Sequence, residues 1–555
     1  MSSTLKIYCK NLKEYLALDG GESLVEVAAA LGDRLGFEPV CALVNNKVEG
    51  LVYRVFTPKQ VEFLPLGSAT GKRCYTHSLC MVLYRAVESV APGSRLQISH
   101  SVSGGLYVKV SGLVPGEESA SLLREEMRKV VDADLPIERK ERPTGDVIEM
   151  FASRGLEAKV KLLRTLHELY TIYYRLDGVV DLCISPLVPR TGMLRVFDIQ
   201  PYEEGFLLLG VDPSDTGAVA RMTPQPKVFN AFRQYRRFNH IVGISNAGDV
   251  NEMVETGREG NMVNVAEALH TKYIREIADS ITERHSRGGA RIVLIAGPSS
   301  SGKTTFTKRL GVELLTNLIR PVMISLDDYF VDRHRTPLDE TGDYDYESLY
   351  ALDLDLFNAH LNALLRGEEV ELPKYNFEKG TSEWSGTKIR LEPDTVLLVE
   401  GIHGLNPGLT AAVDEEVKYR VYVSALSSIT IDDHNWVSTT DNRLLRRMVR
   451  DYKYRGSSPI DTIARWPSVR RGEEKWIFPY QENADAIFNS SLLFELGVIR
   501  DEAERVLRSV PRDCVEYAVA YRLRRFLGYF APVSSRLIPP TSLLREFLGG
   551  SSFHY

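Results

Sequence analysis

The sequence Gly297-Pro-Ser-Ser-Ser-Gly302-Lys303-Thr304 fits the pattern GxxxxGK[ST]. An apolar run, Arg291-Ile-Val-Leu-Ile-Ala, precedes it, and Thr305-Phe-Thr-Lys-Arg-Leu can continue it as a helix. This strand–loop–helix setting is the context in which the pattern forms a phosphate-binding loop. Glycines let the backbone approach a phosphate closely, and successive N–H groups at the start of a helix bind anions. The motif therefore predicts a nucleotide site.

Each residue type in the motif has an expected role. Lys303 places positive charge at the β- and γ-phosphates, and the Thr304 hydroxyl is suited to hold Mg²⁺. We therefore predict ATP and Mg²⁺ as cofactors. The residues predicted to bind ATP are Gly297, Pro298, Ser299, Ser300, Ser301, Gly302, Lys303, Thr304 and Thr305.

More apolar runs follow the loop, separated by stretches with helical periodicity. They begin at Pro321, Thr395 and Tyr419. Strands that alternate with helices indicate an α/β domain with a doubly wound parallel sheet. The fold class predicted for the C-terminal half is thus a P-loop NTPase-type α/β domain.

Acidic residues end two of the predicted strands. Asp327 and Asp328 follow the second strand, and Glu400 closes the run that begins at Thr395. Ligands bind beyond the carboxyl ends of the strands in open α/β sheets. A phosphoryl transferase needs one carboxylate to accept a proton and another to hold Mg²⁺. We assign Asp327 as the base that accepts the proton, at a position also near the metal, and Glu400 as a ligand of the metal. Asp328 remains the alternative to Asp327.

A basic helix is predicted after the fourth strand. Its arginines recur every three to four residues and would share one face. Guanidinium groups on such a face can cover a transferring phosphoryl group, which predicts a lid. These residues are Arg443, Arg446, Arg447 and Arg450.

Six motifs in this order resemble the phosphoribulokinase/uridine kinase family over residues 291–495. They are the phosphate loop, Ser325-Leu-Asp327-Asp-Tyr-Phe, Tyr346-Glu347 leading to Leu352-Asp353, Pro373-Lys-Tyr375-Asn-Phe377, Glu400-Gly-Ile, and Arg446-Arg-Met-Val-Arg450-Asp. The resemblance implies that Asp327 is the base, Glu400 helps to hold magnesium, and Arg447 and Arg450 contact ATP phosphates. It also implies that Glu347, Tyr375 and Arg455 bind the acceptor.

The sequence departs from pyrimidine nucleoside kinases at three positions. Gly380 stands where they carry a base-contacting histidine, Ser457 replaces an arginine, and Glu347 replaces an aspartate. Losing a donor that pairs with a base weakens discrimination between bases. The expected activity is therefore transfer of the ATP γ-phosphate to a hydroxyl, with a nucleoside such as uridine or cytidine as first candidate. The alternatives are a kinase of the same family for another hydroxyl compound, or an ATP-dependent regulatory switch whose N-terminal half senses a ligand or RNA.

The N-terminal half resembles two parts of threonyl-tRNA synthetase. Residues 1–65 resemble a TGS domain, and residues 66–215 resemble the editing-type second domain, through Thr76-His77-Ser78 and Asp181-Leu-Cys183. That family's HSxxH and DLCxGPH motifs imply a hydrolytic site of three histidines and a cysteine. Here Met81 and Leu187 replace two of the histidines. Two remaining polar groups cannot complete such a site, so we expect deacylase chemistry to be lost. His77 and Cys183 either pack in the core or keep a residual ligand.

Composition limits the classes of protein further. The 555 residues are 44% apolar and carry a net charge of −6, which excludes a disordered chain and argues against nucleic acid as a partner,. No apolar stretch is long enough to span a membrane. Six scattered cysteines form no CxxC pair and suit a reducing cytoplasm,. A small-molecule substrate, a cytoplasmic location and a homo-oligomer are compatible with these features.

The predicted organisation has five parts. The two N-terminal units are expected to be α+β. Residues 216–288 are expected to be a connector that is irregular at first and helical from Asn261 to Arg284. The remaining parts are the kinase-like domain at 289–495 and a helical C-terminal segment at 496–555.

Overall fold

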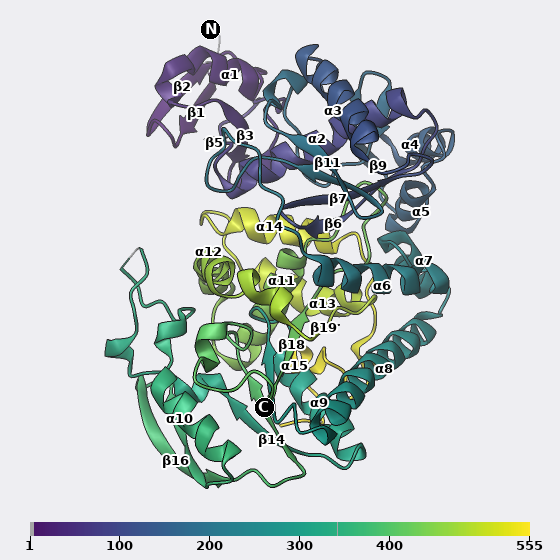
Figure 1. Cartoon of the computed structure of the whole chain (residues 1–555). Coiled ribbons are helices and arrows are strands. Elements are labelled where there is room, and N and C mark those ends of the chain that lie inside the picture. Colours follow the sequence, from purple (N-terminus) through teal and green to yellow (C-terminus); the bar gives the residue numbers. More distant parts are fainter. Residues whose placement is uncertain (1–4, 341, 555) are drawn as a thin grey trace.

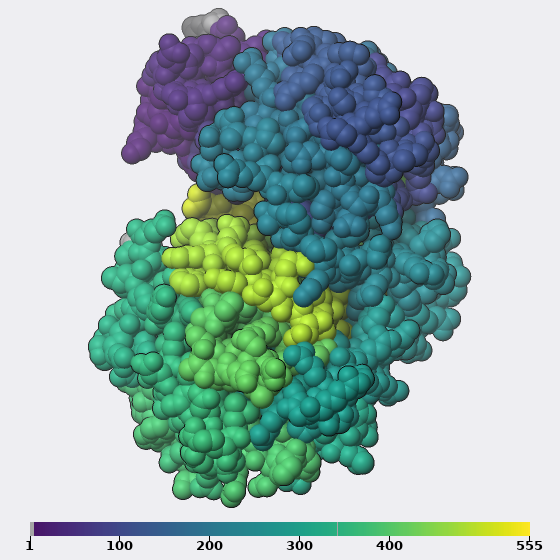
Figure 2. Space-filling model, in the orientation of Figure 1, coloured from purple at the N-terminus to yellow at the C-terminus, as the bar shows by residue number. Residues whose placement is uncertain are grey.

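The computed structural model describes residues 5–340 and 342–554. Figure 1 shows the N-terminal elements (purple to blue) at one end of the molecule and the α/β sheet (teal to green) at the other. Figure 2 shows C-terminal residues (yellow) between these two halves. The predicted fold class, an α/β C-terminal half with an α+β N-terminal half, is confirmed. The five domain boundaries stay a prediction.

Five strands form the first sheet, in the spatial order β2-β1-β5-β3-β4. Helix α1 (Leu24–Leu31) begins after Ser23, whose hydroxyl accepts the N–H of Glu26 in a capping box,. Asn45 and Asn46 have positive φ and form the turn between β3 and β4,. The strands are β1 (Leu5–Cys9), β2 (Glu14–Leu18), β3 (Pro39–Val44), β4 (Lys47–Glu49) and β5 (Gln60–Pro65).

Two further sheets follow, in the orders β11-β12-β7-β6 and β10-β9-β8. Their strands are β6 (Leu96–Val102), β7 (Gly105–Val110), β8 (Glu138–Pro143), β9 (Tyr170–Leu176), β10 (Val179–Asp181), β11 (Asp198–Tyr202) and β12 (Gly205–Leu209). The helices are α2 (Ala69–Val90), α3 (Glu117–Asp132), α4 (Thr144–Ala152) and α5 (Glu157–Leu166). Helix α5 ends at Leu166 because His167 adopts a left-handed conformation, and Tyr170 begins β9,.

The connector contains more helix than predicted. Helices α6 (Pro226–Val242) and α7 (Ala247–Glu255) occupy the stretch that we expected to be irregular, and α8 (Glu259–Ser286) follows. Pro226 lies in the first turn of α6, where its missing N–H costs nothing,. The apolar side of α6 packs against both halves. No helix within the described ranges is long and apolar enough to cross a membrane.

The sheet of the C-terminal half is parallel and has the strand order β14-β17-β13-β18-β19. Its strands are β13 (Ile292–Ala296), β14 (Arg320–Ser325), β17 (Thr395–Glu400), β18 (Lys418–Ser424) and β19 (Ala486–Asn489). The predicted phosphate loop leaves β13 in the middle of the sheet. A separate hairpin is formed by β15 (Val370–Asn376) and β16 (Thr381–Ile389).

Helices surround this sheet and fill the C-terminal segment. They are α9 (Lys303–Thr316), α10 (Leu354–Leu365), α11 (Thr439–Tyr454), α12 (Pro459–Trp476), α13 (Glu495–Arg508), α14 (Tyr517–Leu527) and α15 (Arg545–Leu548). Helix α14 lies against β4 of the first sheet, and the Arg512 carbonyl accepts a hydrogen bond from the Asn46 amide. The C-terminal segment therefore ties the first sheet to the kinase half.

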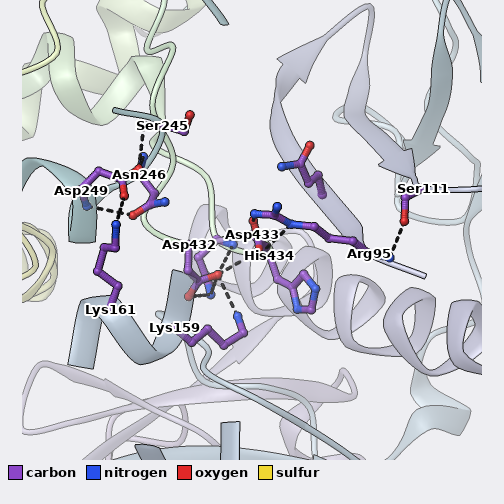
Figure 3. Close-up of polar contacts among 12 residues, drawn as sticks. Arg95, Ser111, Lys159, Lys161, Ser245, Asn246, Asp249, Asp432, Asp433 and His434 are labelled. Atoms are coloured by element: carbon purple, nitrogen blue, oxygen red, sulfur yellow. Dashed lines mark hydrogen bonds and ion pairs between the residues drawn. The ribbon is translucent and has the colours of Figure 1, made fainter. Parts of the chain in front are cut away.

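A buried ionic network joins the two halves (Figure 3). Lys159 of α5 contacts Asp181 at 2.7 Å and Asp432, in the loop between β18 and α11, at 2.8 Å. His434 of the same loop contacts Asp181 at 2.7 Å. Burial alone would raise the pKa of Asp181, but the charges of His434 and Lys159 outweigh burial and lower it to about 2. Each buried charge in this network has an opposite charge beside it.

We predict that Lys159→Met destabilises the protein by roughly 3–5 kcal/mol, because it leaves Asp181 and Asp432 buried without their cation. The measurement is urea unfolding followed by circular dichroism. The matched control is Lys140→Met, at a half-exposed lysine on β8, which should leave the unfolding midpoint nearly unchanged,. Equal midpoints for both variants would contradict the role of Lys159.

Candidate functional site

The loop between β13 and α9 has the backbone that close approach to an anion requires. A Cβ at Gly297 would lie 1.9 Å from the Val423 carbonyl oxygen of β18, so only glycine fits there. Ser300 and Gly302 have φ of 57° and 85°, in the left-handed region. Such a backbone turns successive N–H groups toward one point, and the N-terminus of α9 lies at the same place.

Two buried arginines of α11 support the loop from outside. Arg443 donates to the Ser299 carbonyl at 3.0 Å, and Arg446 reaches the carbonyls of Ser300 and Ser301 at 3.4 Å. Glu473 pairs with Arg443, and Glu495 pairs with Arg446. Both arginines are almost completely buried. The prediction that they belong to a lid is therefore wrong: they hold the loop backbone in place.

Glu400, at the end of β17, accepts a hydrogen bond from the Thr304 hydroxyl at 2.7 Å. Burial raises the pKa of Glu400 to about 7, and burial lowers the pKa of Lys303. A carboxylate and a hydroxyl at hydrogen-bond distance form a pair of oxygen ligands of the kind that Mg²⁺ prefers. The structure thus brings together two of the predicted metal ligands.

A cavity of about 820 Å³ opens beside this pair. Asp327 lies exposed in the turn that follows β14 and lines the cavity, as does half-buried Asp328. Burial raises the pKa of Asp328, and Asp327 next to it acts in the same direction. Arg450 and Arg455 of the α11 end line the same cavity. Thr304, Glu400, Asp327, Arg450 and Arg455 therefore surround one space.

Other predicted residues lie outside this lining: Lys303, the predicted loop residues other than Thr304, and Arg447, Tyr375 and Glu347. Arg447 donates to the Ser299 hydroxyl at 2.9 Å and pairs with Asp451 at 3.2 Å. Tyr375 of β15 is buried, with its ring 5.5 Å from that of Phe330. Tyr375 thus packs in an aromatic group in this structure.

Glu347 packs against Gly472 of α12, at which a Cβ would lie 2.4 Å from the Glu347 Cβ. Burial raises the pKa of Glu347 to about 7, and nearby Glu473 adds to that effect. The charges of Arg447 and Lys303 act on Glu347 in the opposite direction. Glu347 therefore belongs to the electrostatic surroundings of the loop, although it does not line the cavity beside Glu400.

The C-terminal segment covers part of the loop. Leu543 lies against Gly302, and Glu546 of α15 accepts the backbone N–H of Thr305 at 3.2 Å and its hydroxyl at 2.8 Å. Figure 1 shows α15 and the C-terminus close to α9 and β14. Thr305 is one of the predicted ATP ligands, so the Glu546 carboxylate and an ATP phosphate would compete for the same donors.

The sequence analysis missed the acids that complete this site. Glu473, Glu495 and Glu546 lie 170 residues or more along the chain from the loop atoms that they or their arginine partners contact. Two arginines on the apolar side of a helix could have indicated buried cations that need carboxylate partners. No local pattern identifies which acids supply them.

Comparison with known proteins gives a match over most of this half. Residues 292–492 match the model of the "Phosphoribulokinase / Uridine kinase family". The chain carries a kinase domain of this family. A solved structure described as a "Possible Uridine Kinase" from Bacillus stearothermophilus is 18% identical, with 39% of this chain and 100% of that chain covered and a TM-score of 0.26. For D-glycerate 3-kinase from Cryptococcus neoformans the identity is 14%, the coverage 46% and 87%, and the TM-score 0.22.

The N-terminal region matches threonine–tRNA ligases. The ligase of Carboxydothermus hydrogenoformans is 32% identical over 180 residues, which are 32% of this chain and 28% of the ligase. That of Syntrophomonas wolfei is 30% identical over 181 residues, with the same two coverages. The chain thus spans less than a third of the length of these relatives. The predicted fusion of a kinase-family domain to a synthetase-like region is confirmed.

In the synthetase-like region, the loop before α11 of the kinase domain covers the residues of the editing motifs. Trp436 stacks on His77 with ring centroids 4.6 Å apart, and burial lowers the pKa of His77 to about 3. Met81 and Leu187 are buried. Among the described residues, no group of three or more His, Cys, Asp or Glu side chains could hold a metal ion. Loss of deacylase chemistry stays a prediction, with Trp436 as a further argument for it.

We predict that Glu546→Gln strengthens ATP binding by roughly three- to tenfold, because an anion no longer competes for the Thr305 donors. The measurement is equilibrium binding of ATP to the full chain by calorimetry. Glu283→Gln, at an exposed helical glutamate, is the control. Weaker ATP binding in Glu546→Gln would mean that Glu546 assists the nucleotide instead of competing with it.

Proposed function

We propose that the protein is an ATP- and Mg²⁺-dependent kinase that transfers the γ-phosphate of ATP to a hydroxyl group of a small molecule, with a nucleoside as the first candidate. The observation that supports this most is the single cavity at the end of the phosphate loop. There the Thr304–Glu400 pair faces an exposed carboxylate, Asp327, and two arginines, Arg450 and Arg455. Phosphoryl transfer needs a proton acceptor, ligands for a metal ion and positive charges around one space.

The donor set fits a magnesium ion. Thr304 and Glu400 supply oxygen ligands, and burial raises the pKa of Glu400 to about 7 although the charge of Lys303 acts to lower it,. Asp327, which lines the same cavity, would be a further or water-mediated ligand. When bound, Mg²⁺ neutralises charge on the β- and γ-phosphates.

Different residues of the chain would then have different roles in the reaction. Asp327 accepts the proton as the acceptor hydroxyl attacks; the new bond joins that oxygen to the γ-phosphorus, and the bond to the β-phosphate oxygen breaks, which releases ADP. Lys303 and Arg450 stabilise the negative charge that spreads over the phosphoryl oxygens. Arg443 and Arg446 do not contact substrate and act by keeping the loop in shape.

One feature of the structure bears on the identity of the acceptor. Gly380 has φ of 72°, and a Cβ there would lie 2.7 Å from the Arg333 Nε. Arg333 donates to the Phe377 carbonyl at 2.6 Å and fills the place next to Gly380. A histidine could not occupy position 380 without displacing Arg333. This favours, as second candidate, a hydroxyl compound other than a pyrimidine nucleoside.

The cellular setting proposed from the sequence is the cytoplasm. All six cysteines are free thiols in the structure, which suits a reducing compartment,.

Asp327→Asn is expected to lower kcat by roughly 10²–10⁴-fold, since it removes the proton acceptor, while ATP binding changes little. Lys303→Ala should abolish turnover and weaken ATP binding as well. Single-turnover phosphoryl transfer and ATP calorimetry measure the two effects. Asp328→Asn is the matched control and should keep most activity. If Asp328→Asn is inactive and Asp327→Asn is active, the two aspartates exchange roles.

A panel of acceptors tests the substrate class. Uridine, cytidine, purine nucleosides, hexoses and glycerate are each supplied with ATP and Mg²⁺, and ADP release is measured. We expect one class to give ADP well above the acceptor-free rate, with nucleosides as the first candidates. Activity confined to sugars or polyols would favour the second candidate, and a rate independent of every acceptor would contradict the kinase.

A further inference from the structure

A second large cavity lies at the junction of the two halves, apart from the phosphate loop. Its volume is about 1110 Å³, slightly above the roughly 300–1,000 Å³ typical of small-molecule sites,. Its walls come from β6, β7, the start of α5, α6 and the loop that follows β18. Figure 3 shows part of this region, with Lys161 and Asp249 on one side and Arg95 with Asp433 on the other. No residue of the phosphate loop lines it.

Ion pairs neutralise most of the charge in this cavity. Arg95 pairs with Asp433 and Lys161 with Asp249, each at 2.8 Å. Glu204 contacts both Lys109 at 3.0 Å and Arg233 at 3.3 Å. The fourth lining acid, Glu157, is exposed at the start of α5.

Two cations of α6 remain without a carboxylate partner in the described residues. The Arg236 guanidinium donates to the Gln97 side-chain oxygen at a long 3.4 Å. Burial lowers the pKa of Arg236, and Glu204, which forms no ion pair with it, acts in the opposite direction,. Arg237, one residue further, is exposed at the rim of the cavity. A half-buried guanidinium without an ion-pair partner is costly unless an anion arrives from outside,.

The same walls hold buried polar atoms without partners among the described residues. They are His100 Nε2, Tyr107 Oη and Asn239 Oδ1, on side chains that are at most 3% exposed. His100 stacks on Phe232 with ring centroids 3.7 Å apart, and burial lowers its pKa well below the usual value, so its ring is neutral. Buried polar groups almost always have partners, so unpartnered ones around a cavity indicate a missing ligand.

We propose that this cavity binds a small organic anion. Arg236 and Arg237 would hold its carboxylate or phosphate group, and His100, Tyr107 and Asn239 would hydrogen-bond its polar body. Two free cations are too few for a nucleic-acid backbone, where six to ten phosphate contacts are usual, whereas one guanidinium inside a recess suits one anionic group. The site is separate from the proposed catalytic cavity and does not depend on the kinase proposal.

The test uses full-length protein with Lys303→Ala, which disables the phosphate loop as a competing anion site. Calorimetry measures binding of citrate, inorganic phosphate and uridine 5′-monophosphate, which separates carboxylate from phosphate ligands. At least one probe should bind saturably, and adding Arg236→Gln should weaken it by roughly tenfold or more. Arg237→Gln, at the exposed rim, should weaken it less and serves as second variant if Arg236→Gln does not fold. Arg164→Gln, at an exposed arginine of α5 outside the cavity, is the control and should bind normally.

Three results would overturn the proposal. The first is that no probe binds the Lys303→Ala protein. The second is binding that neither Arg236→Gln nor Arg237→Gln changes. The third is binding of tRNA that depends on Arg236 while all three small probes fail, which would make this surface an RNA site.

Discussion

The backbone carbonyls on the outer side of the phosphate loop need hydrogen-bond donors, and the helices of this half of the molecule are arranged to supply them. A loop that turns its N–H groups toward a phosphate turns carbonyl oxygens away from it, and those of Ser299, Ser300 and Ser301 lie in the protein interior. Arg443 and Arg446 donate to them. Each guanidinium then needs its own counter-charge, which Glu473 of α12 and Glu495 of α13 supply. The conformation of the loop thus fixes how three helices pack.

The same loop-and-helix unit also explains how the two halves hold together. The segment between β18 and α11 leads into the arginine helix, and before it does so it places Asp432 beside Lys159 and Trp436 over His77. In this arrangement the residues of the editing motifs pack against the loop that precedes α11. The replacement of two histidines by Met81 and Leu187 suits this packing, because apolar side chains can be buried there without unpaired polar atoms,.

The sequence predicted best the features that neighbouring residues determine. It predicted worst the contacts between residues that are far apart in the chain. The strand, loop and helix around Gly297 follow from neighbouring residues, and so do the acids that end β14 and β17. The spacing of Arg443 and Arg446 correctly predicted one face, but periodicity alone does not tell whether a charged face meets solvent or buried acids. The connector helix α6 was missed because its apolar positions are interrupted by arginines and asparagines. The contact of Glu546 with Thr305 joins residues 241 positions apart, which no local signal can reveal.

The buried cations of this protein can be compared by the carboxylates that compensate their charge. Lys159 has two carboxylates, Arg443 and Arg446 have one each, and Arg309 has Glu267 at 3.4 Å. These groups lie in packed interior, where an uncompensated charge would be strongly destabilising. Arg236 departs from this rule and lies on a cavity wall instead of in packed interior. Imperfect packing alone would be relieved by a shift of the long side chain toward solvent. Arg236 instead stays half-buried on the cavity wall, and this position favours an external anion.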